Sequence, residues 1–376
     1  MNDLKEITVF SIGDSTELKT WSNVPYFFTK TLLEKNIKVN RVNLQENNFL
    51  SKIYKYTFYA LLKLIYRNSN HSYFRSRLNY YLTNRKIISA ITQYPNSQCL
   101  LFLTFSFSAP KITGKKTILF GDWTYFYFIS NFLKRKPYWF EQYVLNKERE
   151  NIATSDFILS LFPKSHEYNL NHFTNTKQYY LGNVINCNYQ LNYTKVIIEK
   201  TKSNKLLFIG NKKYLQGAID LINSFNQLKS KSELHIIGLN ETEVGITHSC
   251  LFYHGYLNKG DESQNNLYYK LISESRVIIN TNPDWGAFSA MTEAMYFYTP
   301  VITSPYDEFV KTYGNEIDFG YYVESQNKND LIIKIETILN CTEESQLIMM
   351  KNAHEKVKHF TWNKYLDKFL DLLNKS

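Results

Sequence analysis

The sequence predicts an α/β protein with two Rossmann-like domains. Short apolar runs rich in β-branched residues recur along the chain and end in Gly, Asn or Asp, as buried parallel strands do. A strand, a glycine-containing loop and a helix open the chain, and the same order begins again near residue 206. With 376 residues the chain is also too long for one ordinary core.

The expected elements follow from this pattern. In the first half, strands are expected at 7–12, 38–44, 99–104, 116–120 and 157–161, and helices at 24–35, 51–91 (one or two) and 138–152. In the second half, strands are expected at 206–210, 234–238, 251–254, 277–280 and 301–303, and helices from about 218, at 266–273, from 289 and after 362. The polar stretch 186–204 is expected to link the two domains.

Positive charge is concentrated in one part of the first half. The chain has 44 Lys and Arg against 34 Asp and Glu, a net charge of +10. No acidic residue lies between Glu46 and Asp122, and this interval holds eleven of the basic ones, so the remainder is nearly neutral. A surface of one sign predicts an anionic partner.

Several classes of protein are disfavoured by composition. No run of about 18 uncharged apolar residues could span a membrane. The first residues lack a basic and then apolar signal segment. Four widely spaced cysteines form no metal or redox motif. We therefore expect a cytoplasmic protein, and peripheral attachment to the inner face of the membrane is compatible with this composition.

Residues 51–91 allow three interpretations. Lys52, Lys55, Lys63 and Arg67 recur at helical spacing, and apolar residues occupy another face. A basic, aromatic-rich amphipathic helix of this kind suits the interface of an anionic membrane. A helix that packs on the core and exposes a basic face fits as well. Nucleic-acid binding is disfavoured because no nucleic-acid motif is present.

The most informative stretch runs from residue 276 to residue 303. An apolar strand is followed by turn residues, and Ser289 is a good N-cap for the next helix, which contains Glu293. Free amides of residues 287–290 and the positive end of the helix dipole would then meet at one point. Such a point binds phosphate, and a carboxylate one turn into the helix could accept hydrogen bonds from a ribose.

Asp122 is a second candidate side chain. It follows the predicted strand 116–120, at the carboxyl edge where open α/β sheets bind ligands. It could meet an acceptor hydroxyl there. It could equally cap the helix that follows.

The stretch 276–303 resembles the donor-binding segment of glycosyltransferase family four, whose fold is GT-B. The family pattern is a glutamate, seven residues, a second glutamate, then Ala and a small-residue turn into Pro-Val-Ile. Glu293-Ala294-Met295 and Thr299-Pro300-Val301-Ile302 match it, whereas the first glutamate falls on Trp285, with Asp284 one residue away. Taken alone, the segment also fits an ordinary strand–helix unit with a glutamate at the edge of its core.

Two loops near the expected donor phosphates also resemble the family. Thr-Trp-Ser-Asn-Val-Pro-Tyr at 20–26 resembles a loop that faces the phosphates and implies roles for Ser22 and Asn23, although it also reads as a capped helix start with Pro in its first turn. In the loop 211–217 the glycine is present, but Gln216 stands at the position of a Lys and Asn211 at that of an Arg. Lys212 and Lys213 are the nearest cations.

Other matches extend the resemblance along the chain. The run 254–257 resembles the loop that holds the nucleotide base, which implies contacts from Tyr256 and Leu257, with His254 read as structural. The run 181–186 resembles the end of the family's first domain, and the tail resembles its closing helix. The resemblance therefore implies two Rossmann-like domains, 1–190 and 191–357, facing across a cleft, and a segment 358–376 whose helix packs back on the first domain.

The implied function is sugar transfer. A nucleotide-sugar, expected to be a UDP-sugar, would donate to a glycan or lipid-linked acceptor, with retention, in bacterial surface polysaccharide or lipopolysaccharide synthesis. Glu293 would hold the ribose and Asp122 would orient or deprotonate the acceptor. The diphosphate would be held by residues at and before the helix start together with two lysines: Gly286, Ala287, Phe288, Ser289, Lys212 and Lys213.

No cofactor or metal is implied, because amides and lysines would stabilise the departing diphosphate. The chain has no Asp-x-Asp, the metal-binding signature of the other main transferase fold. The alternative is a degenerate protein of the same fold that binds a nucleotide-sugar or a partner without catalysis. Trp285 and Gln216 are the residues that favour this alternative.

Overall fold

The computed structural model describes residues 4–110, 114–174, 177–187, 189, 192–283, 288–324 and 326–375. The chain divides into two compact units, Met1–Val184 with Trp362–Ser376, and Ile185–Thr361. Each unit contains one six-stranded sheet, and every strand pairing in both sheets is parallel. In the described part of the chain no helix is long and apolar enough to cross a membrane.

The first sheet has the order β2-β1-β3-β4-β5-β6. Its strands are β1 (Glu6–Ser11), β2 (Lys38–Asn43), β3 (Cys99–Phe102), β4 (Lys116–Gly121), β5 (Phe157–Ser160) and β6 (Gln178–Tyr180). The main helices of this unit are α1 (Val24–Glu34), α2 (Asn48–Tyr54), η2 (Lys55–Tyr59), α3 (Ala60–Ile65), α4 (Arg77–Gln93), α5 (Tyr125–Tyr127), η4 (Phe128–Phe132), α6 (Gln142–Thr154), α7 (Pro163–His172) and α16 (Trp362–Asn374). Shorter turns are η1 (Trp21–Asn23), η3 (Tyr73–Arg75) and η5 (Trp139–Glu141).

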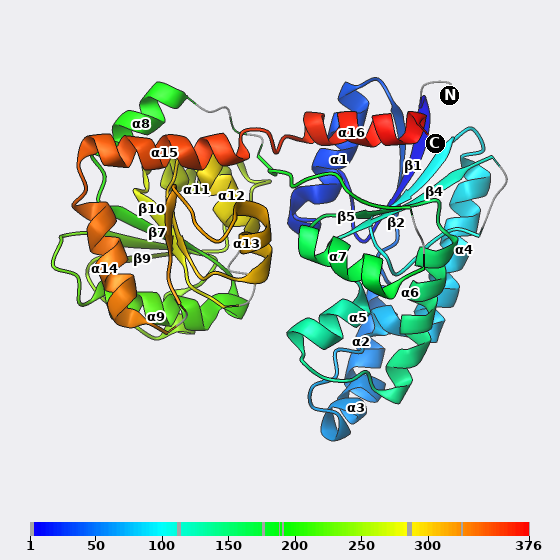
Figure 1. The fold of residues 1–376 in the computed structure, drawn as a ribbon. Coiled ribbons are helices and arrows are strands. Elements are labelled where there is room, and N and C mark those ends of the chain that lie inside the picture. The colour runs from blue at the N-terminus through cyan, green and yellow to red at the C-terminus, as the bar shows by residue number, and fades with distance from the viewer. Residues whose placement is uncertain are drawn as a thin grey trace. The chain divides into compact units, whose positions relative to one another are not determined.

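Alternating side chains give the first sheet two apolar faces. On one face Phe10 stacks on Phe102 with ring centroids 4.3 Å apart, in a core shared with α4 and α6. On the other, Phe28 of α1 packs against Phe120 and against Trp362 of α16. The C-terminal helix therefore returns to the first unit, as predicted, and α1 and α16 lie side by side in Figure 1.

The second sheet has the order β12-β11-β10-β7-β8-β9. Its strands are β7 (Lys205–Ile209), β8 (Glu233–Ile237), β9 (Leu251–Gly255), β10 (Val277–Asn280), β11 (Val301–Thr303) and β12 (Gly320–Tyr322). The helices of this unit are α8 (Tyr193–Thr201), η6 (Lys212–Tyr214), α9 (Leu215–Phe225), α10 (Glu241–Val244), α11 (Glu262–Glu274), α12 (Phe288–Tyr296), α13 (Asp307–Tyr313), α14 (Lys328–Leu339) and α15 (Glu343–Val357).

The expected link 186–204 is not a free linker. Helix α8 occupies its central part, and Val196 and Lys200 of this helix are buried in the second unit. The Lys200 ammonium donates to the carbonyl oxygens of Ile272 and Ser275 and to the Thr299 hydroxyl. Burial lowers the pKa of Lys200 well below its usual value. The prediction failed because a lysine in a polar stretch is normally read as solvated.

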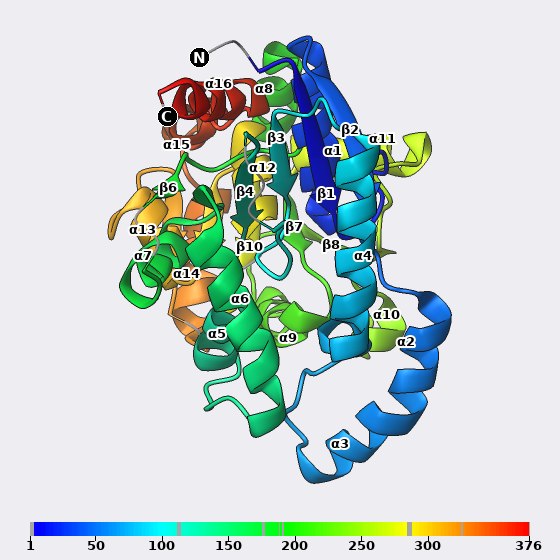
Figure 2. The same cartoon turned by 90° about the vertical axis from the view of Figure 1, so that its right-hand side faces the viewer.

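Residues 51–91 contain two helices, as expected. The first is continuous from residue 48 to residue 65 through α2, the π-helical turn η2 and α3, and a loop separates it from the long helix α4. Helix α4 packs on the core through Ile87 and Ala90, whereas in α3 only Leu62 is buried. Figures 1 and 2 show α2 and α3 at the tip of the first unit, away from its sheet.

Candidate functional site

In the second unit, strand order places two loops together at the carboxyl edge of the sheet. Successive strands run outward from β7 in one direction and from β10 in the other, so the order reverses between these neighbours. Open α/β sheets bind ligands at such a switch point. The loop after β7 and the loop after β10 meet there, and a Cβ on Gly217 would lie 3.5 Å from the Asn282 nitrogen.

The loop after β7 carries the predicted lysines. Lys212 and Lys213 lie in the turn η6 with exposed side chains, and among the described residues neither forms an ion pair. Asn211 caps this turn by accepting a hydrogen bond from the Lys213 amide at 3.0 Å. Gln216 donates to Asp220 at 3.0 Å, so its amide is bound to its own helix. The loop therefore offers two solvated ammonium groups at the switch point.

The helix after β10 begins one residue earlier than predicted. Helix α12 starts at Phe288, so Ser289 lies inside its first turn instead of capping it. Phe288 is buried and packs against Phe309 and Tyr313, which fixes the start of the helix, and Ser289 is exposed. Gly286 and Ala287, like Asp284 and Trp285, lie outside the described residues.

Glu293 is enclosed by hydrogen-bond donors. The Lys259 ammonium donates to both of its carboxylate oxygens, at 2.6 and 2.8 Å. The hydroxyls of Tyr268 and Tyr269 donate to one oxygen each, at 2.8 and 2.9 Å. The side chain of Glu293 is only 6% exposed. Since a carboxylate has about four acceptor positions, these four bonds fill them.

The surroundings of this carboxylate are arranged to keep its donors protonated. Burial raises the pKa of Tyr268 and Tyr269 well above the usual tyrosine value, and the Glu293 charge raises both further. The Lys259 ammonium also lies over the Tyr268 ring, 4.2 Å from its centroid. The cluster joins the loop after β9, which carries Lys259, to α11 and α12.

The same loop holds the two residues expected to meet the nucleotide base. Tyr256 is 72% exposed, whereas Leu257 is buried. His254, at the end of β9, lies with its Nε2 3.0 Å from Nδ1 of His235, and burial lowers the pKa of both rings. This pairing agrees with a structural role for His254.

In the first unit, the switch point lies between β1 and β3. The loop that leaves β1 reaches η1, where Trp21, Ser22 and Asn23 have φ values of 36°, 51° and 70°. Three consecutive residues other than glycine in left-handed backbone are costly and are typical of functional sites. Asn23 precedes α1 without a side-chain cap bond, while Pro25 occupies the first turn as predicted.

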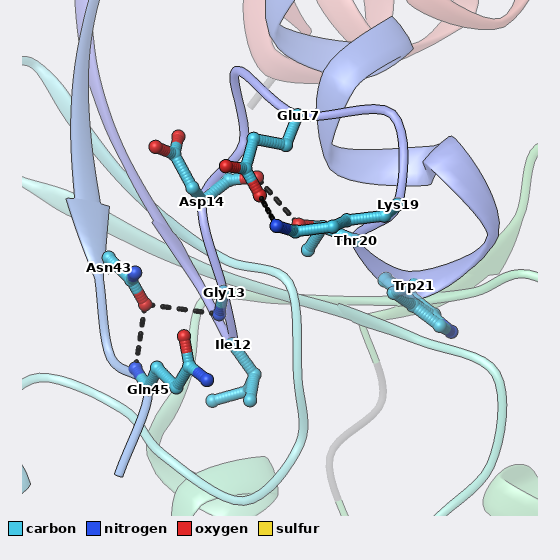
Figure 3. A pocket seen from close by; sticks show the side chains of 9 residues that line it. All are labelled: Ile12, Gly13, Asp14, Glu17, Lys19, Thr20, Trp21, Asn43 and Gln45. Atoms are coloured by element: carbon cyan, nitrogen blue, oxygen red, sulfur yellow. Dashed lines mark hydrogen bonds and ion pairs between the residues drawn. The ribbon is translucent and has the colours of Figure 1, made fainter. Parts of the chain in front are cut away.

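A polar pocket of about 550 Å³ opens beside this loop at the ends of β1 and β2 (Figure 3). The Asn43 side-chain oxygen accepts from the amides of Gly13 and Gln45, at 3.1 and 2.7 Å. Gly13 has a φ of 104°, and a Cβ there would lie 2.9 Å from the Thr20 methyl group. The remaining polar lining of the pocket includes Asp14 and a Glu17–Lys19 ion pair, and Trp21 lies at the edge of the pocket.

Asp122 is connected to this pocket through Trp21. It directly follows β4, and its Oδ1 accepts from the Trp123 amide at 2.8 Å. Its Oδ2 lies 3.4 Å from the Trp21 indole nitrogen, which donates to it. The helix that follows is capped instead by Thr124, which accepts from the Tyr127 amide. The alternative role of Asp122 as a helix cap is therefore wrong.

The structure also brings forward residues that the sequence reasoning missed. Lys259, Tyr268 and Tyr269 enclose Glu293, and Trp21 joins Asp122 to a pocket. Adjacent tyrosines in an amphipathic helix looked like ordinary core residues. Their partner, Glu293, could have been identified only from the packing of α11 against α12.

A search with protein-family models matches residues 191–356 to "Glycosyl transferases group 1". No curated protein matches the sequence. Among solved structures, a glycosyltransferase from Rickettsia africae has a TM-score of 0.67 at 16% identity, covering 100% of both chains. WaaG, a glycosyltransferase involved in lipopolysaccharide biosynthesis, has a TM-score of 0.64 at 12% identity, covering 99% of this chain and 100% of its own.

A mutant of TarM from S. aureus, in complex with fondaparinux, alpha-GlcNAc-glycerol and UDP, has a TM-score of 0.58 at 14% identity. That match covers 78% of this chain, which spans 59% of the TarM mutant chain. The fold of the chain is thus the two-domain GT-B fold. Within it, residues 191–356 match the model of the group 1 glycosyl transferases, so this part of the chain is similar to that family.

Proposed function

We propose that the protein transfers a sugar from a UDP-sugar to a glycan or lipid-linked acceptor. The observation that carries this proposal is the coincidence of the group 1 domain with a switch point that presents exposed lysines beside the start of α12. The TarM mutant structure, which holds UDP, supports the nucleotide, and WaaG supports a role in surface polysaccharide or lipopolysaccharide synthesis. Such a reaction would take place on the cytoplasmic side of a bacterial membrane.

Donor binding is assigned to the second unit. The first amides of α12, at Phe288 and Ser289, and the ammonium groups of Lys212 and Lys213 would hold the diphosphate. Negative charge grows on that group as the bond to the sugar breaks, and fixed donors stabilise it. With these groups the transfer needs no metal ion. Tyr256 and Leu257 would border the base.

The ribose role of Glu293 requires an exchange of partners. Its acceptor positions are filled, so a ribose hydroxyl can bind only when a present donor leaves. Lys259 is the donor that can do so, because it lies on a loop and its side chain is 15% exposed, whereas both tyrosines are buried in α11. Donor binding would then release the Lys259 ammonium.

Acceptor binding is assigned to the first unit. Asp122 follows β4 at the carboxyl edge of the first sheet, and its Oδ2 accepts a hydrogen bond from the indole of Trp21, which lines the polar pocket. A carboxylate in that place can orient an acceptor hydroxyl or take its proton. We propose retention of configuration, following the family resemblance.

A thermal-shift panel tests the donor assignment. UDP at about 100 times its dissociation constant should stabilise the protein by about 2.7 kcal/mol. We expect the shift with UDP and UDP-sugars, with less from ADP or GDP, and the same shift in EDTA and in Mg²⁺. A response that requires the metal would contradict the metal-independent site. Stabilisation by UDP without transfer to any acceptor would favour the alternative of a non-catalytic binding module.

A further inference from the structure

The segment α2–η2–α3 exposes an unusual amount of apolar surface. Leu64 is 78% exposed, Tyr56 74% and Phe49 71%. Four more large apolar side chains of the segment are also exposed: Ile53, Phe58, Leu61 and Ile65. A concentration of exposed large apolar side chains on one short segment marks an interaction site.

The other side of this segment is anchored to the first unit by aromatic contacts. Tyr54 packs against Tyr73 with ring centroids 5.8 Å apart, and Leu62 is buried. Beyond α3, the Tyr66 ring lies 4.7 Å from that of Tyr138. The segment therefore has an inner side that packs and an outer side that does not, so its exposed residues are a fixed feature of the fold.

Basic residues alternate with the exposed apolar ones. Lys52, Lys55, Lys63 and Arg67 lie on this segment or just after it, and no acidic residue occurs from 47 to 121. The ammonium of Lys55 lies over the Tyr56 ring and that of Lys63 over the Tyr59 ring, at 5.5 and 5.6 Å from the centroids. Long basic side chains can cover an apolar surface with their stems while their charges reach outward.

A tryptophan extends the same surface. Trp139 is 73% exposed, and its indole nitrogen donates to the Tyr66 hydroxyl at 3.2 Å. Tryptophan and tyrosine are enriched where a membrane meets water, because one end of each ring is apolar and the other is polar. Because Trp139 lies beside the end of α3, it adds a residue that is both polar and aromatic to the border of the exposed apolar side chains.

We propose that residues 48–67 and Trp139 form a membrane-docking surface for a bilayer that contains anionic lipid. The apolar side chains would enter the headgroup boundary while Lys52, Lys55, Lys63 and Arg67 contact lipid phosphates. Charge alone would also suit nucleic acid, but exposed leucine, isoleucine and phenylalanine have no role on a phosphate backbone. This surface goes beyond the transfer reaction and does not depend on it. If both hold, the enzyme meets its acceptor at the membrane.

Vesicle sedimentation tests the docking surface directly. The full chain should sediment with vesicles of phosphatidylcholine and phosphatidylglycerol at low salt, and much less with phosphatidylcholine alone. Salt should weaken this binding because it screens the charges. Failure to sediment with the anionic vesicles at low salt would overturn the proposal.

Two pairs of variants separate the apolar and the charged contributions. Tyr56→Gln with Leu64→Gln should weaken binding to anionic vesicles at least tenfold, and Lys52→Gln with Lys55→Gln should weaken it about fivefold for each charge removed. The matched controls lie on α14 and α15 of the second unit: Ile333→Gln with Ile348→Gln, and Lys328→Gln with Lys351→Gln. These control residues are also exposed. Equal losses in variants and controls would contradict a localised surface.

Hydrogen exchange locates the surface that contacts vesicles. Sedimentation velocity tests the other possible partner of this surface, a second copy of the chain. Vesicles should protect amides in 48–67, while amides of α14 should exchange as in the free protein. Protection elsewhere, with none in 48–67, would refute the assignment. A dimer that is lost in the Leu64→Gln variant, without vesicle binding by the parent protein, would assign the face to self-association instead.

Discussion

The carboxylates at the edges of the two sheets, Glu293 and Asp122, are buried to different extents. In the second unit, Glu293 accepts four hydrogen bonds from its own chain and is almost fully enclosed. In the first unit, Asp122 is half-buried, and its Oδ2 accepts a hydrogen bond at 3.4 Å from the indole of Trp21, a residue that lines a pocket. Both residues lie beyond the carboxyl ends of strands, where ligands bind in such folds.

The difference shows that a residue of a binding motif can stabilise the fold as well as contact the ligand. Glu293 occupies the position that the family resemblance assigns to ribose contact, yet it also ties the loop after β9 to α11 and α12. Asp122 accepts from the Trp123 amide and from the indole of Trp21, which lines the pocket of the first unit. We therefore expect changes at Asp122 to affect the reaction and changes at Glu293 to affect the fold as well.

The largest expected effect is on the reaction, through Asp122→Asn. Transfer should slow by about 10²- to 10⁴-fold, which is the usual contribution of a general base. Asparagine keeps an oxygen that can accept from the Trp123 amide, so the fold should survive. The measurements are the transfer rate and the dissociation constant for UDP, which should not change. Asp156→Asn is the control, since Asp156 accepts from the Thr117 amide at the opposite edge of the same sheet. A full rate in the Asp122→Asn variant would remove the acceptor assignment.

The next effect is on stability, through Glu293→Ala. This change leaves the Lys259 ammonium and two buried hydroxyls without their acceptor, which should cost about 3–5 kcal/mol. Urea unfolding measures the loss. Lys259→Met together with Glu293→Gln removes both charges, and it should cost clearly less than the sum of the single changes. Additive losses would show that the pair is not coupled, against the geometry.

Much of the fold was accessible from the sequence because its strands are buried on both faces. Runs such as 277–280 and 301–303 match β10 and β11 residue for residue, since a continuous apolar run has few other stable places. The expectation that 186–204 is only a link did not hold at Lys200, because the partners of its ammonium group are backbone carbonyl oxygens far away in sequence. Helices α13, α14 and α15 were not predicted, and two of them pack on helices far away in sequence, α14 on α9 and α15 on α12.

The candidate site was less accessible because its chemistry depends on contacts between elements. The lysines of η6 followed from the family resemblance, and the position of Asp122 followed from the strand pattern and the topology. The saturation of Glu293 did not, because Lys259 lies 34 residues away and its approach depends on how the loop after β9 folds over α12. Trp21 likewise reaches Asp122 across 101 residues.

A third prediction uses Glu148, a buried carboxylate of the first unit that accepts from the Tyr125 amide. Burial raises its pKa to about 7, so the folded protein binds a proton more tightly than the unfolded chain does. Its contribution to stability is therefore fully present below about pH 4.5 and is lost as the pH rises toward 7. Glu148→Gln should remove that loss, a difference of at most about 3 kcal/mol at pH 8. Urea unfolding at pH 5 and pH 8 measures it, with Glu141→Gln as the contrast. Arg135 holds the pKa of Glu141 below its usual value, so that variant should lose stability instead.

The smallest expected effect concerns the exposed lysines of η6, and it tests the donor side of the comparison. Lys212→Gln and Lys213→Gln, made singly, should each weaken UDP binding about tenfold, since a hydrogen bond to a charged group contributes about 1.5 kcal/mol. Uridine lacks the diphosphate, so its affinity should not change, and this separates lost phosphate contacts from a disturbed base site. Lys231→Gln is the matched control, because Lys231 is also exposed but lies just before β8, at the other edge of the sheet. Isothermal titration at low and moderate salt gives both affinities. If UDP and uridine weaken equally, the lysines shape the loop instead of meeting the phosphates, and the charge that balances the departing diphosphate must come from α12.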